Sequence, residues 1–299
     1  MSLQANAAKK IFAVFQKNIS KSERKLLMSS HMFAKILIPT FIRRKIDISI
    51  ERLNGFDYVV MKHKKHNTNN KVMYIHGGAF IFEISALHFM QISEIINKTY
   101  ATFYVPIYPL TNDKYSSQMD TINFLTNLYK VMCDESDKKT KITIMGDSAG
   151  GNFALILAQL AKKNKLRIAD NVILVSPFLT YEYDKKYDKI AGNDPVLPPL
   201  LLNTAKAWQL QDNNPKNPLF SPIFGDSKGV GKIFIFCAEN EIFIHLIRHY
   251  CNQLLKQKIW YYLDVAKGLF HDYPIFTTTK EAKIVINKVS DIIKNKKPS

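Results

Sequence analysis

Short apolar runs alternate along most of this chain with stretches in which apolar residues recur every three or four positions. The runs predict β-strands at residues 46–52, 56–62, 71–75, 101–108, 141–145, 171–176, 232–238 and 258–264. Stripes such as Phe153, Ile156, Leu157 and Leu160 predict helices between them, each with one face toward a core. The alternation favours an α/β protein with a mostly parallel sheet covered by helices.

Two segments interrupt this alternation. Residues 1–45 are basic and predict a helical arm, with apolar residues at Ala8, Ile11, Phe12, Phe15 and Ile19. Residues 178–225 separate the sixth and seventh predicted strands and contain Pro195, Pro198, Pro199, Pro215, Pro218 and Pro222. We expect residues 46–299 to form the main domain, with the arm and the 178–225 insertion covering the carboxyl edge of its sheet as a cap.

The chain is strongly basic. Its 42 Lys and Arg residues exceed its 25 Asp and Glu residues, which gives a net charge of +17. Such a charge favours contact with phosphates or anionic lipids. The lysines are scattered, however, and the sequence has no zinc-finger spacing, RNA-binding signature or arginine cluster with interleaved aromatics. We therefore expect no nucleic-acid partner.

Targeting and redox signals are also weak. The run at residues 11–15 after Lys9 and Lys10 is shorter than the ~7–15 residues of a signal-peptide core. No apolar run approaches the ~20 residues that cross a bilayer, so we expect a cytoplasmic protein. Cys133, Cys237 and Cys251 have no metal-ligand spacing, which favours reduced, buried thiols.

The pentapeptide Gly146-Asp147-Ser148-Ala149-Gly150 lies between the fifth predicted strand and a helix. In that context the G-x-S-x-G pattern is typical of a nucleophile elbow, a sharp turn that exposes one serine hydroxyl. Glycines on both sides avoid clashes in the turn. The N–H groups at the start of the helix favour developing negative charge. Ser148 is the candidate nucleophile.

A second small-residue segment, His76-Gly77-Gly78-Ala79, ends the third predicted strand. Small residues let backbone N–H groups approach a substrate oxygen, and acyl transfer needs such donors for the negative charge of its intermediate. We expect the N–H groups of Gly78, Ala79 and Ala149 to form an oxyanion hole, with Gly77 as an alternative donor. We expect His76 to hold this loop by hydrogen bonds, without acting as a base.

The HGGA segment (residues 76–79) and the GDSAGG segment (residues 146–151) together resemble those of the hormone-sensitive-lipase-like family of α/β-hydrolases, which contains bacterial esterases and lipases. The resemblance covers about residues 70–275 and includes Tyr108-Pro109-Leu110 with the later Asp120. A further matching segment is Asn217-Pro218-Leu219-Phe220-Ser221-Pro222. The resemblance implies the α/β-hydrolase fold, with an eight-stranded sheet and a cap. It also implies a carboxylesterase acting on small esters of short or medium acyl chains, without cofactor or metal.

The same resemblance implies where the other two members of a catalytic triad lie. The family places the acid after the seventh strand, which corresponds to Glu241, and the histidine after the eighth, which corresponds to His271. This sequence has Glu where the family usually has Asp, and Ala238 where it has Gly. Glu239 is the alternative acid if the loop register differs.

Several alternatives stay open at this stage. An amidase or peptidase uses the same triad, and a protein on an inactive hydrolase scaffold binds a ligand without turnover. A membrane-surface lipase would use the N-terminal arm as an interfacial helix. His245 and His249 are four residues apart but have no third ligand, so we expect no zinc site there. No sequence motif indicates the natural ester substrate or the oligomeric state.

Overall fold

An eight-stranded sheet runs through the computed structural model, in the order β1-β2-β4-β3-β5-β6-β7-β8. The strands are β1 (Ile46–Leu53), β2 (Phe56–His63), β3 (Lys71–Ile75), β4 (Thr102–Pro106), β5 (Ile142–Asp147), β6 (Asn171–Val175), β7 (Lys232–Ala238) and β8 (Tyr261–Ala266). Pairing is antiparallel from β1 through β2 to β4 and parallel from β4 to β8. The predicted mostly parallel sheet is confirmed.

The structure describes residues 1–7, 9–10, 38–110, 117–182, 194, 196–197, 203, 206, 209–210 and 213–298. Within the expected N-terminal arm, residues 3–7 are described and helical. The apolar residues predicted for the arm, Ala8, Ile11, Phe12, Phe15 and Ile19, lie outside the described residues. Pro195, Pro198 and Pro199 of the insertion also lie outside. No helix within the described part of the chain is long and apolar enough to span a membrane.

A hairpin joins β1 and β2. Asn54 and Gly55 both have positive φ, 54° and 89°, which a tight two-residue turn requires. The prediction for the eighth strand began three residues early. Lys258 has a φ of +57°, and the N–H groups of Lys258 and Ile259 close the preceding helix by donating to Leu255 and Leu254. The chain therefore becomes extended only afterwards.

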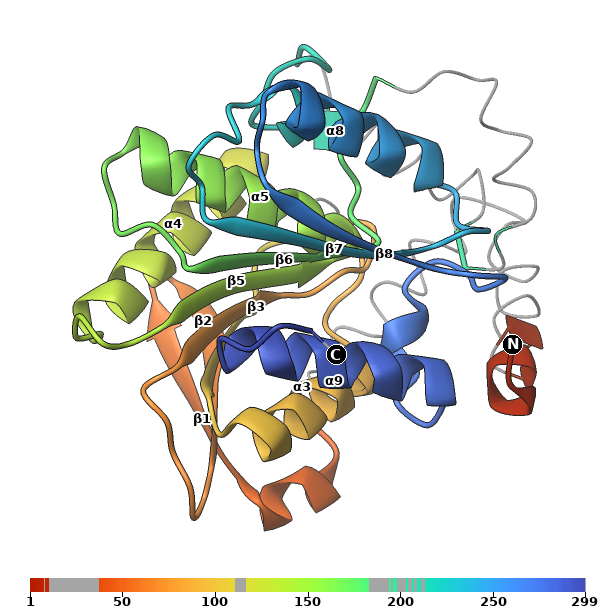
Figure 1. Cartoon of the computed structure of the whole chain (residues 1–299). Helices are drawn as coiled ribbons and strands as arrows, with labels where there is room; N and C mark the ends of the chain where they lie inside the picture. Colours follow the sequence, from red (N-terminus) through yellow and green to blue (C-terminus); the bar gives the residue numbers. More distant parts are fainter. Residues whose placement is uncertain are drawn as a thin grey trace.

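Helices cover both faces of the sheet, as Figure 1 shows. One face carries α3 (Ala86–Thr99) and α9 (Lys280–Ile293), which pack against each other. The other face carries α4 (Gln118–Asp134), α5 (Ser148–Lys163) and α8 (Ile244–Lys256). Each layer buries its own apolar cluster, so the central strands contribute core residues on both sides.

The N-terminus is held against α9. The Ser2 backbone N–H and hydroxyl donate to the two carboxylate oxygens of Glu281, at 2.5 and 2.7 Å. Ala5 is buried in the cluster on the α9 face. The chain then enters the sheet through η1 (Thr40–Arg44). The carboxyl ends of the parallel strands share one edge of the sheet, and the candidate site lies there.

Candidate active site

The nucleophile elbow forms where β5 passes directly into α5. Ser148 has a φ of +49°, a strained value for a residue with a side chain. A Cβ added at Gly146 would lie 2.3 Å from the Gly150 carbonyl oxygen, and one at Gly150 would lie 2.0 Å from the Ile75 oxygen. Both positions therefore require glycine, and the turn leaves the serine at the head of the helix.

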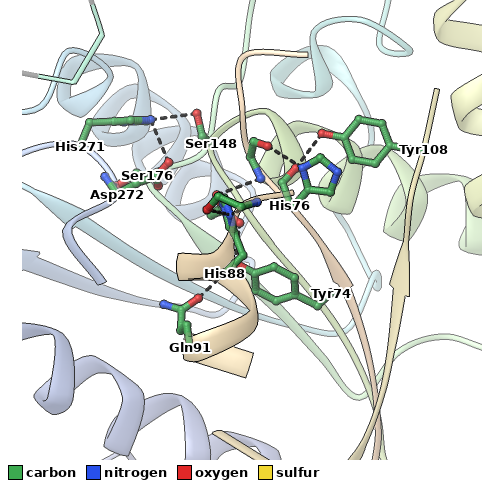
Figure 2. A network of polar contacts seen from close by, with 12 residues as sticks. Tyr74, His76, His88, Gln91, Tyr108, Ser148, Ser176, His271 and Asp272 are labelled. Atoms are coloured by element: carbon green, nitrogen blue, oxygen red, sulfur yellow. Dashed lines mark hydrogen bonds and ion pairs between the residues drawn. The ribbon is translucent and has the colours of Figure 1, made fainter. Parts of the chain in front are cut away.

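His271 reaches this serine from the loop after β8. Its Nε2 lies 2.8 Å from Ser148 Oγ, although the two residues are 123 positions apart in sequence. The Phe243 ring packs edge-on against the imidazole, with ring centroids 5.2 Å apart. One oxygen of Asp272 also lies 3.1 Å from the same Nε2 (Figure 2). The structure thus brings together the predicted nucleophile and the predicted base.

The two candidate acids occupy different environments. Glu241 is fully buried, and its Oε2 accepts hydrogen bonds from the Ser176 hydroxyl at 2.7 Å and the Ala238 N–H at 2.8 Å. Its Oε1 and the Nδ1 of His271 are both buried without a hydrogen-bond partner among the described residues. Glu239 is exposed and accepts only the Gly268 N–H, at 3.2 Å, among the hydrogen bonds of the described chain.

Buried carboxylates control the charge of this side of the site. Burial alone would lower the pKa of His271, but Asp272, Glu241 and Asp194 together raise it above its usual value. Burial raises the pKa of Glu241 to about 8, against the opposing effect of His271. Asp194, from the 178–225 insertion, is 1% exposed and accepts the Ile242 N–H at 3.0 Å. The insertion thus contacts the loop that carries Glu241.

Two of the predicted oxyanion donors, Gly78 and Ala79, lie in the loop after β3, and Ala79 lines the same cavity as Ser148. Gly78, Ala79 and Phe80 have positive φ values of 122°, 52° and 64°. The N–H of Gly77 donates to Asp147 Oδ2 at 2.9 Å, so Gly77 is engaged elsewhere than in an oxyanion hole. Ala149 lies in the first turn of α5, where N–H groups lack partners within the helix.

A family model described as the α/β-hydrolase fold matches residues 72–275. The chain belongs to the α/β-hydrolase fold family. The family expected from the two glycine-rich motifs is therefore confirmed, and so is the fold class. Among the described residues of this α/β-hydrolase, no group of three or more His, Cys, Asp or Glu side chains is arranged to hold a metal ion.

Several named proteins are similar to this α/β-hydrolase. A triacylglycerol lipase from Mycobacterium tuberculosis is 32% identical over 139 residues, which is 45% of this chain and 31% of that protein. An esterase from Acinetobacter venetianus is 22% identical over 228 residues, which is 74% of this chain and 73% of the esterase. A hormone-sensitive lipase structure from a metagenome library matches with a TM-score of 0.83 at 17% identity, covering 96% of this chain and 98% of that one. This last likeness shows the fold.

Sequence reasoning missed the polar residues that support the site of this α/β-hydrolase. Asp147 is part of the elbow motif but had no assigned role, and Asp272 follows His271 directly. His88 stands alone on the first turn of the apolar helix α3. A charged residue at the end of a buried strand and a histidine on an apolar helix were the available signals. Neither names a partner, because the partner comes from another element.

The contacts of His76 lie within its own loop and with Tyr108. Its Nδ1 lies 2.6 Å from the carbonyl oxygen of Gly77, and its ring stacks on Tyr108 with centroids 4.3 Å apart. The Tyr108 hydroxyl donates to the His76 carbonyl oxygen at 2.7 Å. His76 thus contacts its own loop and Tyr108, whereas the nitrogen facing Ser148 belongs to His271.

A cavity of about 20 Å³ lies beside Ser148 of this α/β-hydrolase. Its walls come from the two catalytic loops and from the 178–225 insertion: Ala79, Phe80, Ser148, Ala149, Phe178, Tyr181, Leu197, Lys206 and Phe243. The rings of Phe178 and Tyr181 pack against each other, with ring centroids 4.7 Å apart. Four of these nine residues are aromatic, and the walls enclose little space.

A larger cavity, of about 610 Å³, lies at the other end of the sheet. Its walls include Lys232 at the start of β7 and Trp260 just before β8. Parallel strands begin there, whereas Ser148 and His271 follow strand ends. Size alone would therefore select the wrong pocket, and the geometry of the elbow decides in favour of the smaller one.

Proposed function

We propose that this protein is a serine carboxylic-ester hydrolase that acts on small-molecule esters with short acyl chains. The observation that supports this most is the 2.8 Å contact between Ser148 Oγ and His271 Nε2 at a nucleophile elbow. A nucleophile activated by a neighbouring base is the arrangement that covalent acyl transfer requires. The esterase and lipase names of similar proteins agree with this chemistry.

In the first half-reaction, Ser148 Oγ attacks the ester carbonyl carbon while His271 Nε2 accepts its proton. The carbonyl oxygen becomes an oxyanion, to which the N–H groups of Gly78, Ala79 and Ala149 donate. His271 then returns the proton to the leaving alcohol as the carbon–oxygen bond breaks. An acyl-enzyme on Ser148 results.

In the second half-reaction, water attacks the acyl-enzyme and His271 accepts one of its protons. The tetrahedral intermediate collapses, the acid leaves, and the proton returns to Ser148. Glu241 is the proposed acid that orients His271 and stabilises its cationic form. It is preferred to Glu239 because a carboxylate shielded from water acts more strongly on a nearby charge.

The small cavity supports short acyl chains. A volume of about 20 Å³ exceeds the ~10–15 Å³ that one water occupies, but not by the size of a long chain. An acetyl group therefore requires less movement of Phe178 and Tyr181 than a longer acyl chain. We therefore expect acetyl esters to be better substrates than butyryl esters, and octanoyl esters to be worse than both.

The test measures kcat/KM for p-nitrophenyl acetate, butyrate and octanoate with wild-type protein, Ser148→Ala and Ser290→Ala. Ser148→Ala should lose about six orders of magnitude in kcat. Ser290 is also buried but bonds within α9, so its variant should stay active. A phosphonate label found on a serine other than Ser148, or an active Ser148→Ala variant, would refute the proposal.

A further inference from the structure

A buried carboxylate lies directly behind the nucleophile. Asp147 is 1% exposed and receives hydrogen bonds from three different elements. The Tyr74 hydroxyl of β3 donates to Oδ1 at 2.6 Å, and the Gly77 N–H donates to Oδ2 at 2.9 Å. His88 of α3 places its Nε2 3.2 Å from the same Oδ2 (Figure 2). A buried carboxylate persists only when such partners satisfy it.

His88 is itself held in one orientation. The backbone N–H of Ser85 points at its Nδ1 from 3.1 Å, and the Ser85 hydroxyl lies 2.7 Å from the same atom. Nδ1 of the neutral ring therefore accepts, and the ring hydrogen is on Nε2, facing Asp147. Burial opposes a charge on His88, but the charge and hydrogen bond of Asp147, together with Asp272 and Ser85, outweigh burial and raise the pKa of His88. Nε2 carries a hydrogen in either protonation state.

The loop that Asp147 holds is strained. Directly after Gly77, the residues Ala79 and Phe80 adopt left-handed φ values, which L-residues with side chains avoid. Such a conformation persists only where surrounding contacts enforce it. The Gly77 bond ties the start of this loop to the residue that precedes Ser148. The contact is close, because a Cβ on Gly77 would lie 2.2 Å from Asp147 Oδ2.

We propose that His88 is a positioning residue for the oxyanion hole. Through Asp147 it fixes the distance between the nucleophile Ser148 and the donor N–H groups of Gly78 and Ala79. The inference rests on the proposed esterase function. It goes further by assigning part of the transition-state geometry to a side chain on α3 that does not contact the substrate.

The test compares His88→Leu, His88→Gln and Phe89→Leu with the wild-type protein, using p-nitrophenyl acetate. His88→Leu removes the Nε2 donor, whereas the amide nitrogen of a glutamine can replace it. Phe89→Leu is the control for loosening of α3, since Phe89 is buried on the same helix among apolar residues and its side chain has no hydrogen-bonding group. Tyr74→Phe removes the Oδ1 donor and serves if His88→Leu fails to fold.

Misplaced oxyanion donors reduce the stabilisation of the transition state more than they reduce the binding of the ester substrate. For His88→Leu we expect kcat to fall about tenfold to a hundredfold, below the 10²–10³ typical of a donor removed outright. KM should stay within about twofold of wild type. A trifluoromethyl ketone, which forms a hemiketal oxyanion with the serine, should bind more weakly by the same factor as kcat falls. His88→Gln should recover most of both.

Equal losses of kcat in His88→Leu and Phe89→Leu would mean general loosening of α3 and would overturn the inference. Wild-type kcat and ketone affinity in a folded His88→Leu or Tyr74→Phe variant would do the same while leaving the esterase proposal intact. A wild-type protein without esterase activity would overturn the proposed function itself. These outcomes are distinguishable because the wild-type rate is measured first.

Discussion

The two sides of Ser148 are built differently. On the oxyanion side, both oxygens of Asp147 have hydrogen-bond donors supplied by β3, the following loop and α3. On the acid side, Glu241 Oε1, His271 Nδ1 and Asp272 Oδ1 are buried without a hydrogen-bond partner in the described part of the chain. Directed bonds satisfy both carboxylate oxygens of Asp147 on the first side. On the second side Glu241 is bonded through Oε2 alone, and the charges of His271 and Asp272 act on it.

This difference separates two kinds of contribution to catalysis. Directed bonds set positions, so changes on the oxyanion side should alter kcat through geometry and leave the pH profile alone. Gathered charges set protonation, so changes on the acid side should alter the pH dependence of His271. Variants on each side can break or sharpen this comparison.

The largest effect beyond loss of the nucleophile is expected for Glu241→Gln. The amide keeps the shape but can favour the wrong tautomer of the His271 imidazole, at a cost of roughly 10⁴ in kcat. Glu239→Gln should cost less than about tenfold, because an exposed charge contributes about 1 kcal/mol or less. Steady-state kinetics with circular dichroism as a folding check decide between them. The reverse ranking would make Glu239 the acid, and normal rates in both would place it elsewhere.

A smaller effect is expected for Gly77→Ala on the oxyanion side. The new Cβ would overlap Asp147 Oδ2, so the carboxylate and the loop must separate. We expect kcat to fall by about 10²–10³ without a shift in the pH profile. Gly229→Ala is a control for backbone strain away from the site, because a Cβ there meets nothing within 4 Å although the φ of 75° disfavours a side chain. A pH shift in Gly77→Ala would contradict the separation of the two sides.

The smallest effect is expected for Asp272→Asn. Asp272 raises the pKa of His271 in the folded protein, and only neutral His271 accepts the proton of Ser148. Removing the carboxylate lowers that pKa, so the acid limb of kcat/KM should move by about one unit to lower pH. The rate at its plateau should change less than about tenfold. An acid limb that stays in place would show that Glu241 and Asp194 alone control the charge on His271.

Much of the fold was predictable because its signals are local. Buried parallel strands read as apolar runs, and the turn at Asn54 and Gly55 needs only a backbone conformation that those residues favour. The eighth strand was placed too early because the apolar run from Ile259 includes the closing turn of α8. That turn places Lys258 in the left-handed conformation, which the pattern of apolar residues does not predict.

The candidate site divides along the same line. The sequence by itself determined the elbow at Ser148. Its signals, the two glycines and the change from an apolar strand to a helix, all come from neighbouring residues. Tertiary structure alone decided that His271 Nε2 reaches Ser148, that Glu241 is buried while Glu239 is exposed, and that His88 and Tyr74 meet at Asp147. These contacts join residues up to 123 positions apart. No local pattern encodes them, because the packing of the sheet and its helices sets their distances and their burial.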